Sequence, residues 1–400
     1  MRRELPSLPA PSRPAQSSSR FPIAKWAFAI GLFLTLFASL DLGIGYFAST
    51  RILAKLRPAA SSQATAGSNA VVTTAERLHH GLEPRIDCET EWGPEKYRLR
   101  TDSLGFKSRA VQEVQLTNNA YRIVFLGDSF TEGVGVPAEQ TYAGVVETEL
   151  SGPGRGIEVF NAGVQSYSPK LYFLKTVHCW ENLGFRFNEA WVFIDPSDVA
   201  DELIYSDFTP RGFAHELPLL KEFKFERVQA EPGFFERSIC YRTWMRLVIH
   251  HDPWRRAVYR DVKGGSSFDY YGQCDGWILD DQLYETWGRM GLQSASYYMA
   301  QLATYLRDRG VRLGIAVYPR PNEIQARNRN SRNENFWRDF ARQHDLPFLD
   351  LYPSFISDAP GAMLAERFIK HDVHWNARGH EAVARAWLEY RRSLSMFPKL

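Results

Sequence analysis

A serine follows an apolar run near the middle of the sequence. Residues 122–126, RIVFL, have the composition of a buried strand, and the tripeptide GDS, which ends at Ser129, comes directly after it. Because a residue that follows a parallel strand lies at the carboxyl edge of the sheet, Ser129 is a candidate nucleophile. The alternative is a capping box formed with Glu132, which would only begin a helix. Residues 133–137, GVGVP, are poor helix formers and weigh against a plain helix start.

Two more apolar runs end in residues that could assist such a nucleophile. Residues 157–161 precede Gly163, whose N–H could bind a developing oxyanion or could simply belong to a turn between a strand and a helix. Residues 190–194 precede the sequence DPSD at 195–198. Its aspartates could act in the site or could cap the helix that follows.

A base and its orienting group could come from the loop 371–380, HDVHWNARGH. An aspartate and a histidine in one loop, here Asp372 and His374, can activate a serine elsewhere in the chain. The same loop could instead supply His371, Asp372 and His374 as metal ligands. No other His or carboxylate cluster with ligand spacing completes such a shell, so we expect no metal and no cofactor.

Together these segments resemble the four sequence blocks of the SGNH/GDSL hydrolases. The blocks are GDSF at 127–130, NAG at 161–163, DPSD at 195–198 and DVHWN at 372–376, in the family's chain order. Each block alone is short and weak, whereas the ordered set is fairly specific and spans about residues 121–394. The spacing Asp-x-His replaces the usual Asp-x-x-His, and is similar to that in SGNH-like domains of cell-envelope polysaccharide O-acetyltransferases.

The resemblance implies a role for each residue. Ser129 would attack an acyl carbonyl, His374 would take and return the proton, and Asp372 would orient His374. The N–H groups of Ser129 and Gly163 would bind the oxyanion. Ser197 stands where the family has an asparagine as a further donor. Losing one such donor typically costs about 10²–10³ in rate, unless the Ser197 hydroxyl replaces it.

The elements that must position these residues alternate along the chain. Short apolar runs separated by amphipathic segments predict a parallel sheet covered by helices on both faces. We therefore expect a three-layer α/β/α sandwich, and the resemblance implies the flavodoxin-like SGNH hydrolase fold. The expected strands are 122–126, 157–161, 190–194, 312–318 and 347–351, and the expected helices are 140–150, 169–180, 291–309, 333–344 and 377–393.

One interval breaks the alternation. Residues 205–285 are rich in aromatic side chains and charge but show no clear period. A long stretch without an element pattern is often a lid or an insertion, so we interpret it as a cap near the site. A subdomain that only packs is the alternative. The hydrolase domain is accordingly placed at 121–395, with this insertion inside it.

The N-terminal region has a different composition. Residues 1–20 are rich in Pro and Ser and are predicted to be disordered. Residues 21–48 are apolar enough for a transmembrane signal anchor, with a cleaved signal peptide as the alternative. A flexible linker, 49–75, and an extension, 76–120, follow. More Arg and Lys precede the apolar segment than follow it, which places the catalytic domain outside the cytoplasm, on the periplasmic side in a bacterium.

Charge and cysteine content constrain the partners. The net charge of +2 gives no reason to expect nucleic acid. The four cysteines have no C-x-x-C spacing, and in an oxidising compartment they could form up to two disulfides. Cys240 and Cys274 are the first candidates because both lie in the irregular interval, and free buried thiols are the alternative.

Three functions remain open from the sequence. The first is an extracytoplasmic esterase that hydrolyses acyl esters, acetyl esters above all, on an acylated carbohydrate or similar substrate. The second is an O-acyltransferase that passes the acyl group to a sugar hydroxyl and works with the envelope polysaccharide machinery. The third is a non-enzymatic envelope module with a degenerate site, favoured by the missing block-three asparagine.

Overall fold

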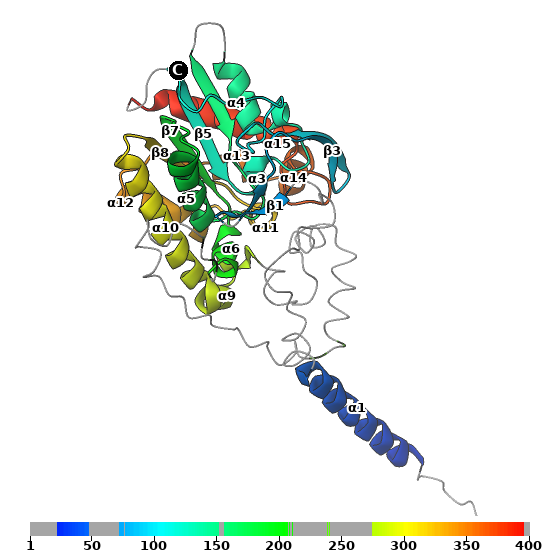
Figure 1. Cartoon of the computed structure of the whole chain (residues 1–400). Coiled ribbons are helices and arrows are strands. Elements are labelled where there is room, and N and C mark those ends of the chain that lie inside the picture. The colour runs from blue at the N-terminus through cyan, green and yellow to red at the C-terminus, as the bar shows by residue number, and fades with distance from the viewer. Residues whose placement is uncertain are drawn as a thin grey trace, which may run out of the picture. The chain divides into compact units, whose positions relative to one another are not determined.

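A five-stranded parallel sheet forms the centre of the folded part of this protein, seen here in a computed structural model (Figure 1). The structure describes residues 22–47, 72–75, 77–151, 156–206 and 274–395, and the single residues 208, 210, 238 and 240. The predicted tail 1–20 and most of the linker and of the insertion lie outside the described residues. Contacts divide the chain into two units, of which the first holds the N-terminal helix and the second the sheet.

The sheet has the strand order β6-β5-β7-β8-β9, and every pair in it is parallel. Numbered in chain order this is 2-1-3-4-5, the flavodoxin-like doubly wound order. The three central strands are nearly or fully buried because helices cover both faces, whereas the edge strands β6 and β9 are partly exposed. The strands are β5 (Tyr121–Gly127), β6 (Ile157–Asn161), β7 (Glu189–Ile194), β8 (Arg312–Val317) and β9 (Phe348–Asp350).

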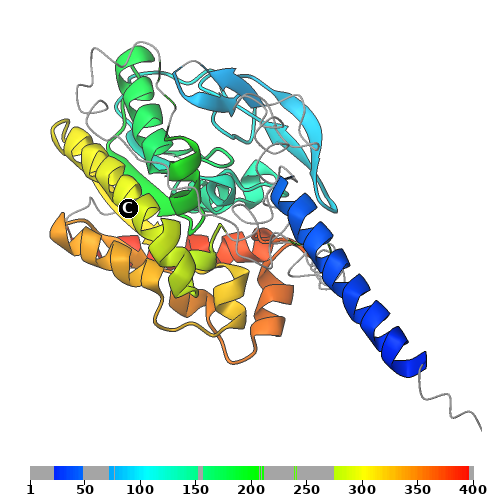
Figure 2. The same ribbon diagram turned by 90° about the horizontal axis from the view of Figure 1, so that it is seen from below.

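Two pairs of helices pack on the sheet. Helices α5 (Pro169–Val177) and α10 (Arg289–Arg307) lie side by side on one face (Figure 2). Helices α4 (Tyr142–Leu150) and α15 (Ala377–Ser393) pack together on the other. The predicted α/β/α sandwich is therefore confirmed. The other helices are α3 (Ser129–Glu132), α6 (Asp198–Ile204), α9 (Asp281–Leu283), α11 (Pro321–Gln325), α12 (Arg332–Gln343), α13 (Tyr352–Phe355) and α14 (Pro360–Arg367).

The extension before the sheet contains β-structure that the sequence analysis did not predict. It forms two antiparallel pairs, β1 (Val72–Ala75) with β2 (His79–Leu82) and β3 (Asp87–Trp92) with β4 (Glu95–Arg100). The second pair is a hairpin closed by the two residues Gly93 and Pro94. Gly93 has φ 59°, the left-handed region that glycine adopts without strain, and proline then supplies a fixed negative φ.

The N-terminal unit contains helix α1, Pro22–Phe47. Its segment Lys25–Ile44 has a mean hydropathy of 2.0 and is long and apolar enough to cross a membrane. A signal sequence near an N-terminus has the same properties, so this helix by itself identifies a candidate span.

The four cysteines are all free thiols, and the predicted disulfide between Cys240 and Cys274 is not formed. Cys179 is buried in the core of the sheet domain, and burial raises the pKa of its thiol to about 12. The Cys274 thiol accepts a hydrogen bond from a guanidinium N–H of Arg320, 3.2 Å away. Of the two thiols in the predicted pair, Cys274 thus has a hydrogen-bond partner in place of a disulfide.

Candidate active site

Ser129 begins a single helical turn at the carboxyl end of the central strand β5. The helix α3 ends after four residues at Gly133, which has φ 75° and donates its N–H to the Ser129 carbonyl. The capping residue is Asp128, whose carboxylate accepts from the Phe130 N–H at 2.9 Å. The capping-box alternative for Ser129 is therefore wrong, and its hydroxyl is available for another contact.

That contact is with the histidine of the C-terminal loop. Ser129 Oγ lies 2.8 Å from Nε2 of His374, and Nδ1 of His374 lies 2.6 Å from Oδ1 of Asp372. All three side chains are buried. The structure thus joins residues far apart in the sequence, 129 and 374, into the serine–histidine–aspartate arrangement that the sequence blocks implied. His371, by contrast, is exposed and has φ 61°.

The same loop is held by its own backbone. The N–H of Ile369 donates to the His374 carbonyl, and the N–H of Asp372 donates to the Ile369 carbonyl. Asn376 then caps α15 by accepting from the N–H groups of Arg378 and Gly379. The histidine therefore projects from a closed turn that is fixed to the start of a long helix.

The charge on Asp372 is stabilised by its neighbours. Burial alone would raise the pKa of its carboxyl group, but the charge of His374 and the hydrogen bonds from His374 and Trp92 hold that pKa below its ordinary value. Since Asp372 is an ionised acceptor, the Nδ1 atom of His374 carries the proton of the neutral ring. Its Nε2 atom is then the acceptor for the Ser129 hydroxyl, which is the tautomer that a general base requires.

Sequence reasoning missed Trp92, which lies at the end of β3 in the extension. Its Nε1–H donates to Oδ2 of Asp372 at 3.2 Å, and its ring meets that of His374 edge-on, with centroids 5.1 Å apart. A signal for the hairpin was present, because a Gly-Pro pair separates two runs of alternating residues, DCETEW and EKYRLR. The contact with Asp372 has no such signal.

The proposed oxyanion donors are less simply arranged. Ser129 is the first residue of α3, where an N–H has no carbonyl within the helix to donate to. The N–H of Gly163 donates to the side-chain oxygen of Asn161 at 3.1 Å. A Cβ at Gly163 would lie 2.3 Å from the Glu132 nitrogen, so only glycine can pack this closely against α3. Gly163 therefore lies beside α3, but its N–H already donates to Asn161, so the structure leaves its role as an oxyanion donor a prediction.

The geometry gives no support to Ser197 as a third donor. Its hydroxyl donates to Oδ1 of Asp195 at 2.5 Å, and its N–H donates to the same oxygen at 2.7 Å. Both polar groups of Ser197 therefore hold the Asp195 carboxylate. The sequence block placed Ser197 correctly at a strand end but could not show which neighbour its hydroxyl would meet.

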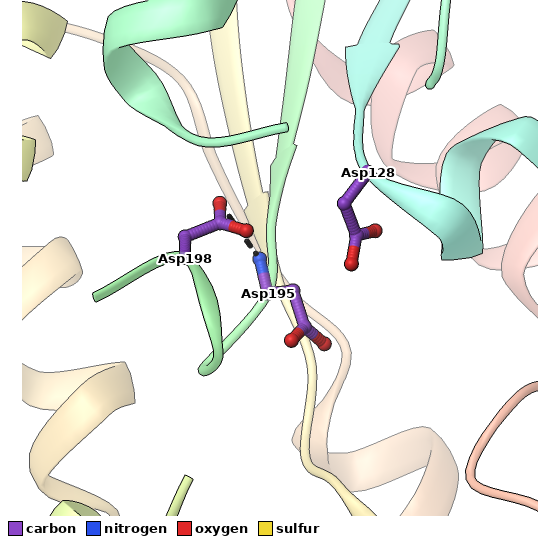
Figure 3. Close-up of side chains that lie close together, drawn as sticks. All are labelled: Asp128, Asp195 and Asp198. Carbon is purple, nitrogen blue, oxygen red and sulfur yellow. Dashed lines mark hydrogen bonds between the residues drawn. The ribbon is translucent and has the colours of Figure 1, made fainter. Parts of the chain in front are cut away.

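Three carboxylates lie close together at the same sheet edge (Figure 3). They belong to Asp128, Asp195 and Asp198, all at most 1% exposed, and each offers an oxygen within 4.8 Å of the others. Arg320 pairs with Asp195 at 3.0 Å, and the Tyr172 hydroxyl donates to Asp198 at 2.8 Å.

Among the described residues this is the group whose composition could hold a metal ion. Its chemistry fits a cation poorly, because a buried guanidinium already neutralises Asp195. Burial and the charge of Asp195 raise the pKa of Asp128 to about 8, and burial with the charges of Asp128 and Asp195 raises the pKa of Asp198. Both shifts favour the protonated forms of these two carboxyl groups, which a bound cation would oppose. The alternative metal site at His371, Asp372 and His374 does not form, because Asp372 and His374 bond each other.

A cavity of about 710 Å³ lies beside the loop that carries His374. Strand β4, the segment after α3, the end of α14 and the start of α15 line it. Its charged residues are Glu95, Lys96, Arg98, Glu139, Glu366 and Arg378. Acidic and basic side chains are equally numerous there, so the cavity has no strong preference for a polyanion or a polycation.

Comparison with known proteins agrees with the sequence blocks. Residues 272–394 match the model of a family described as the SGNH hydrolase-like domain of the acetyltransferase AlgX. The resemblance to SGNH hydrolases is confirmed. The matched segment contains Asp372 and His374 but begins after Ser129, and no protein of curated function matches the chain.

Solved structures with similar folds are GDSL-type proteins and esterases. One is a lipolytic protein of the G-D-S-L family from Veillonella parvula, 12% identical, with a TM-score of 0.36, covering 69% of this chain and 100% of its own. Another is an acetylxylan esterase, Axe2, from Geobacillus stearothermophilus, 15% identical, with a TM-score of 0.35, covering 69% of this chain and 96% of its own. A GDSL-like lipase from Bacteroides thetaiotaomicron is 10% identical, with a TM-score of 0.36, covering 70% and 93%.

Proposed function

We propose that this protein is a membrane-anchored serine esterase that hydrolyses acyl esters, acetyl esters above all, through an acyl-enzyme on Ser129. The observation that carries the proposal is the unbroken chain of contacts from Ser129 Oγ through the His374 ring to Asp372. The family match to an SGNH hydrolase-like domain supports the same reaction class.

The reaction follows from the protonation states. His374 Nε2 accepts the Ser129 proton as Oγ forms a bond to the acyl carbon, and the carbonyl π electrons move to the oxygen. When the tetrahedral intermediate collapses, the bond to the leaving oxygen breaks and His374 Nε2 gives that oxygen the proton. Water, deprotonated by His374, then attacks the acyl-enzyme, and the acid and Ser129 are released. Asp372 stays ionised throughout and stabilises the imidazolium.

The oxyanion would be bound first by the N–H of Ser129 at the start of α3. Gly163 can join it only if its N–H exchanges the Asn161 side-chain oxygen for the oxyanion, since one N–H now serves that acceptor. Such an exchange would stabilise the transition state more than the ground state, which is the requirement for catalysis.

Transfer to a sugar hydroxyl is the second candidate. One observation favours it: the matched family is described as an acetyltransferase. The acyl-enzyme is common to both reactions. The outcome depends on whether water or a sugar hydroxyl reaches it.

We further propose that α1 anchors the protein in a membrane with the sheet domain on the extracytoplasmic side. The apolar segment Lys25–Ile44 and the Arg and Lys residues that precede it support this orientation. In sealed right-side-out vesicles, we expect external protease to degrade the sheet domain. A sheet domain protected until the vesicles are lysed would contradict the orientation.

The decisive test uses the full chain in detergent with a short-chain acetyl ester. We expect slow hydrolysis that Ser129→Ala abolishes, together with covalent labelling of the wild type by a serine-directed phosphonate. Ser296→Ala, which removes a hydroxyl that donates to the Gln293 carbonyl on α10, is the matched control and should keep full activity. Undiminished hydrolysis by Ser129→Ala would overturn the proposal. If labelling occurs with little hydrolysis, adding oligosaccharide acceptors and measuring their acetylation distinguishes transfer from hydrolysis.

A further inference from the structure

The hairpin β3–β4 brings a residue from outside the hydrolase-like segment into contact with the candidate active site. Its two-residue turn, Gly93–Pro94, leaves Trp92 and Glu95 as the last paired residues. Trp92 is therefore at the tip of a rigid element, 280 residues before its partner Asp372. Because the hairpin lies before β5, nothing in the SGNH sequence blocks would lead to this residue.

Trp92 supplies a hydrogen bond to the second oxygen of the Asp372 carboxylate. Oδ1 accepts from the ring and backbone N–H groups of His374, and Oδ2 accepts from the indole N–H of Trp92. With donors on both oxygens, the plane of the carboxylate is fixed, and so is the direction in which it holds His374. The histidine ring is also enclosed, between the edge contact with Trp92 and the ring of Phe130 at 4.7 Å.

The hairpin is anchored to the segment that follows the nucleophile. Tyr97 and Leu99 of β4 are buried with Leu82 in a small apolar cluster against which Trp92 packs. The Lys107 ammonium lies 4.8 Å above the Tyr97 ring and donates to the carbonyls of Gly133 and Val136, at 2.7 and 2.6 Å.

Gly133 ends the helix that Ser129 begins, so one buried lysine holds the hairpin and the nucleophile turn together. Trp92 is therefore held in its orientation by the packing around it before any substrate binds.

We infer that Trp92 is a positioning residue that acts through Asp372, and that the extension is therefore part of the catalytic unit. This inference rests on the proposed function. The indole N–H orients the carboxylate and draws part of its negative charge away from His374. Without that donor, more charge would face the imidazolium, and His374 would keep its proton to a higher pH.

The test is Trp92→Phe in the full chain, which keeps an aromatic ring but removes the N–H. We expect kcat to fall about 10-fold, the effect of losing one hydrogen bond to a charged group, with little change in KM. The acidic limb of the pH–rate profile should move to higher pH, a change that a purely structural role would not cause. Trp180→Phe, at a tryptophan that stacks on Arg186, is the matched control and should leave the limb in place.

A second measurement checks that the effect passes through the carboxylate. In an Asp372→Asn background, Trp92→Phe should cost less than about 2-fold, because coupled residues are not additive. Trp92→Leu, which also lacks the N–H, replaces Trp92→Phe if the latter lowers the melting temperature. An acidic limb that stays at its wild-type position, or an undiminished 10-fold cost in the Asp372→Asn background, would overturn the inference. The proposed function fails separately, through an active Ser129→Ala.

Discussion

Two buried carboxyl groups near the same serine have pKa values shifted in opposite directions. Asp372 is 5% exposed and its pKa lies below the ordinary value, whereas Asp128 is 1% exposed and its pKa is raised to about 8. Burial acts in the same direction on both, since it always disfavours the ionised form. The difference lies in the partners: Asp372 has a histidine and a tryptophan N–H, while Asp128 has a second carboxylate, that of Asp195.

The comparison suggests why the acidic cluster does not disable the site. Three ionised carboxylates beside Ser129 would repel an oxyanion forming there, but Arg320 neutralises Asp195, and the raised pKa values of Asp128 and Asp198 favour their neutral forms. Asp372, whose pKa is lowered, is the carboxylate that acts on His374. In many enzymes the surroundings give two neighbouring carboxyl groups different pKa values.

The largest effect should come from removing the charge of Asp372, which orients His374. Asp372→Asn keeps the shape of the side chain but favours the wrong tautomer of His374, so we expect a loss of about 10⁴-fold in kcat. Phosphonate labelling of Ser129 should slow in parallel. Asp358→Asn, on an exposed carboxylate paired with Arg329, is the control and should be fully active. A loss of less than 10-fold in Asp372→Asn would mean that His374 works without this carboxylate.

Removing the cation from the other cluster should affect stability. Arg320→Met leaves Asp195 buried without its ion pair, and breaking a buried pair in this way typically costs about 3–5 kcal/mol. We expect a marked fall in melting temperature. Arg329→Met, in an exposed pair with Asp358, should change it little. Equal melting temperatures for the two variants would show that the buried ion pair adds no more to stability than the exposed one.

The raised pKa of Asp128 should make the stability of the protein depend on pH. Because the pKa of Asp128 is raised on folding, the folded chain holds a proton there that the unfolded chain releases above about pH 4. Stability should therefore fall as pH rises from about 4 to about 8. Asp128→Asn, which can still cap α3, should make the decline in melting temperature over this range less steep. An unchanged slope would show that Asp128 is ionised in the folded protein.

The smallest effect is expected at Ser197. Ser197→Ala removes a hydroxyl that donates to Asp195, while the backbone N–H continues to donate to the same oxygen. We expect less than about 3-fold change in kcat, because a group bound to Asp195 is not available as an oxyanion donor. The measurement is the steady-state rate beside that of the wild type. A loss of about 10²-fold would restore Ser197 as an oxyanion donor.

The elements of the sheet were largely predictable from local pattern. The strand at Ile157–Asn161 and the helix at Ala377–Ser393 have the predicted bounds, because buried parallel strands and amphipathic helices leave a clear period in the sequence. The hairpin β3–β4 was missed, since its exposed face is highly charged and its buried residues are few. The Gly93–Pro94 turn was the one feature of the sequence that indicated a hairpin. It does not indicate the surface against which the hairpin packs.

The sequence by itself determined the SGNH blocks, the parallel sheet that places their residues at one edge, and the apolar N-terminal segment. Local composition and order along the chain are sufficient for these features. Tertiary structure decided which side chains meet: that Ser197 bonds to Asp195, that Asn161 occupies the Gly163 N–H, and that Trp92 reaches Asp372. Tertiary structure also decided the pKa shifts of the buried carboxyl groups, because these depend on neighbours that the fold brings together from distant parts of the chain.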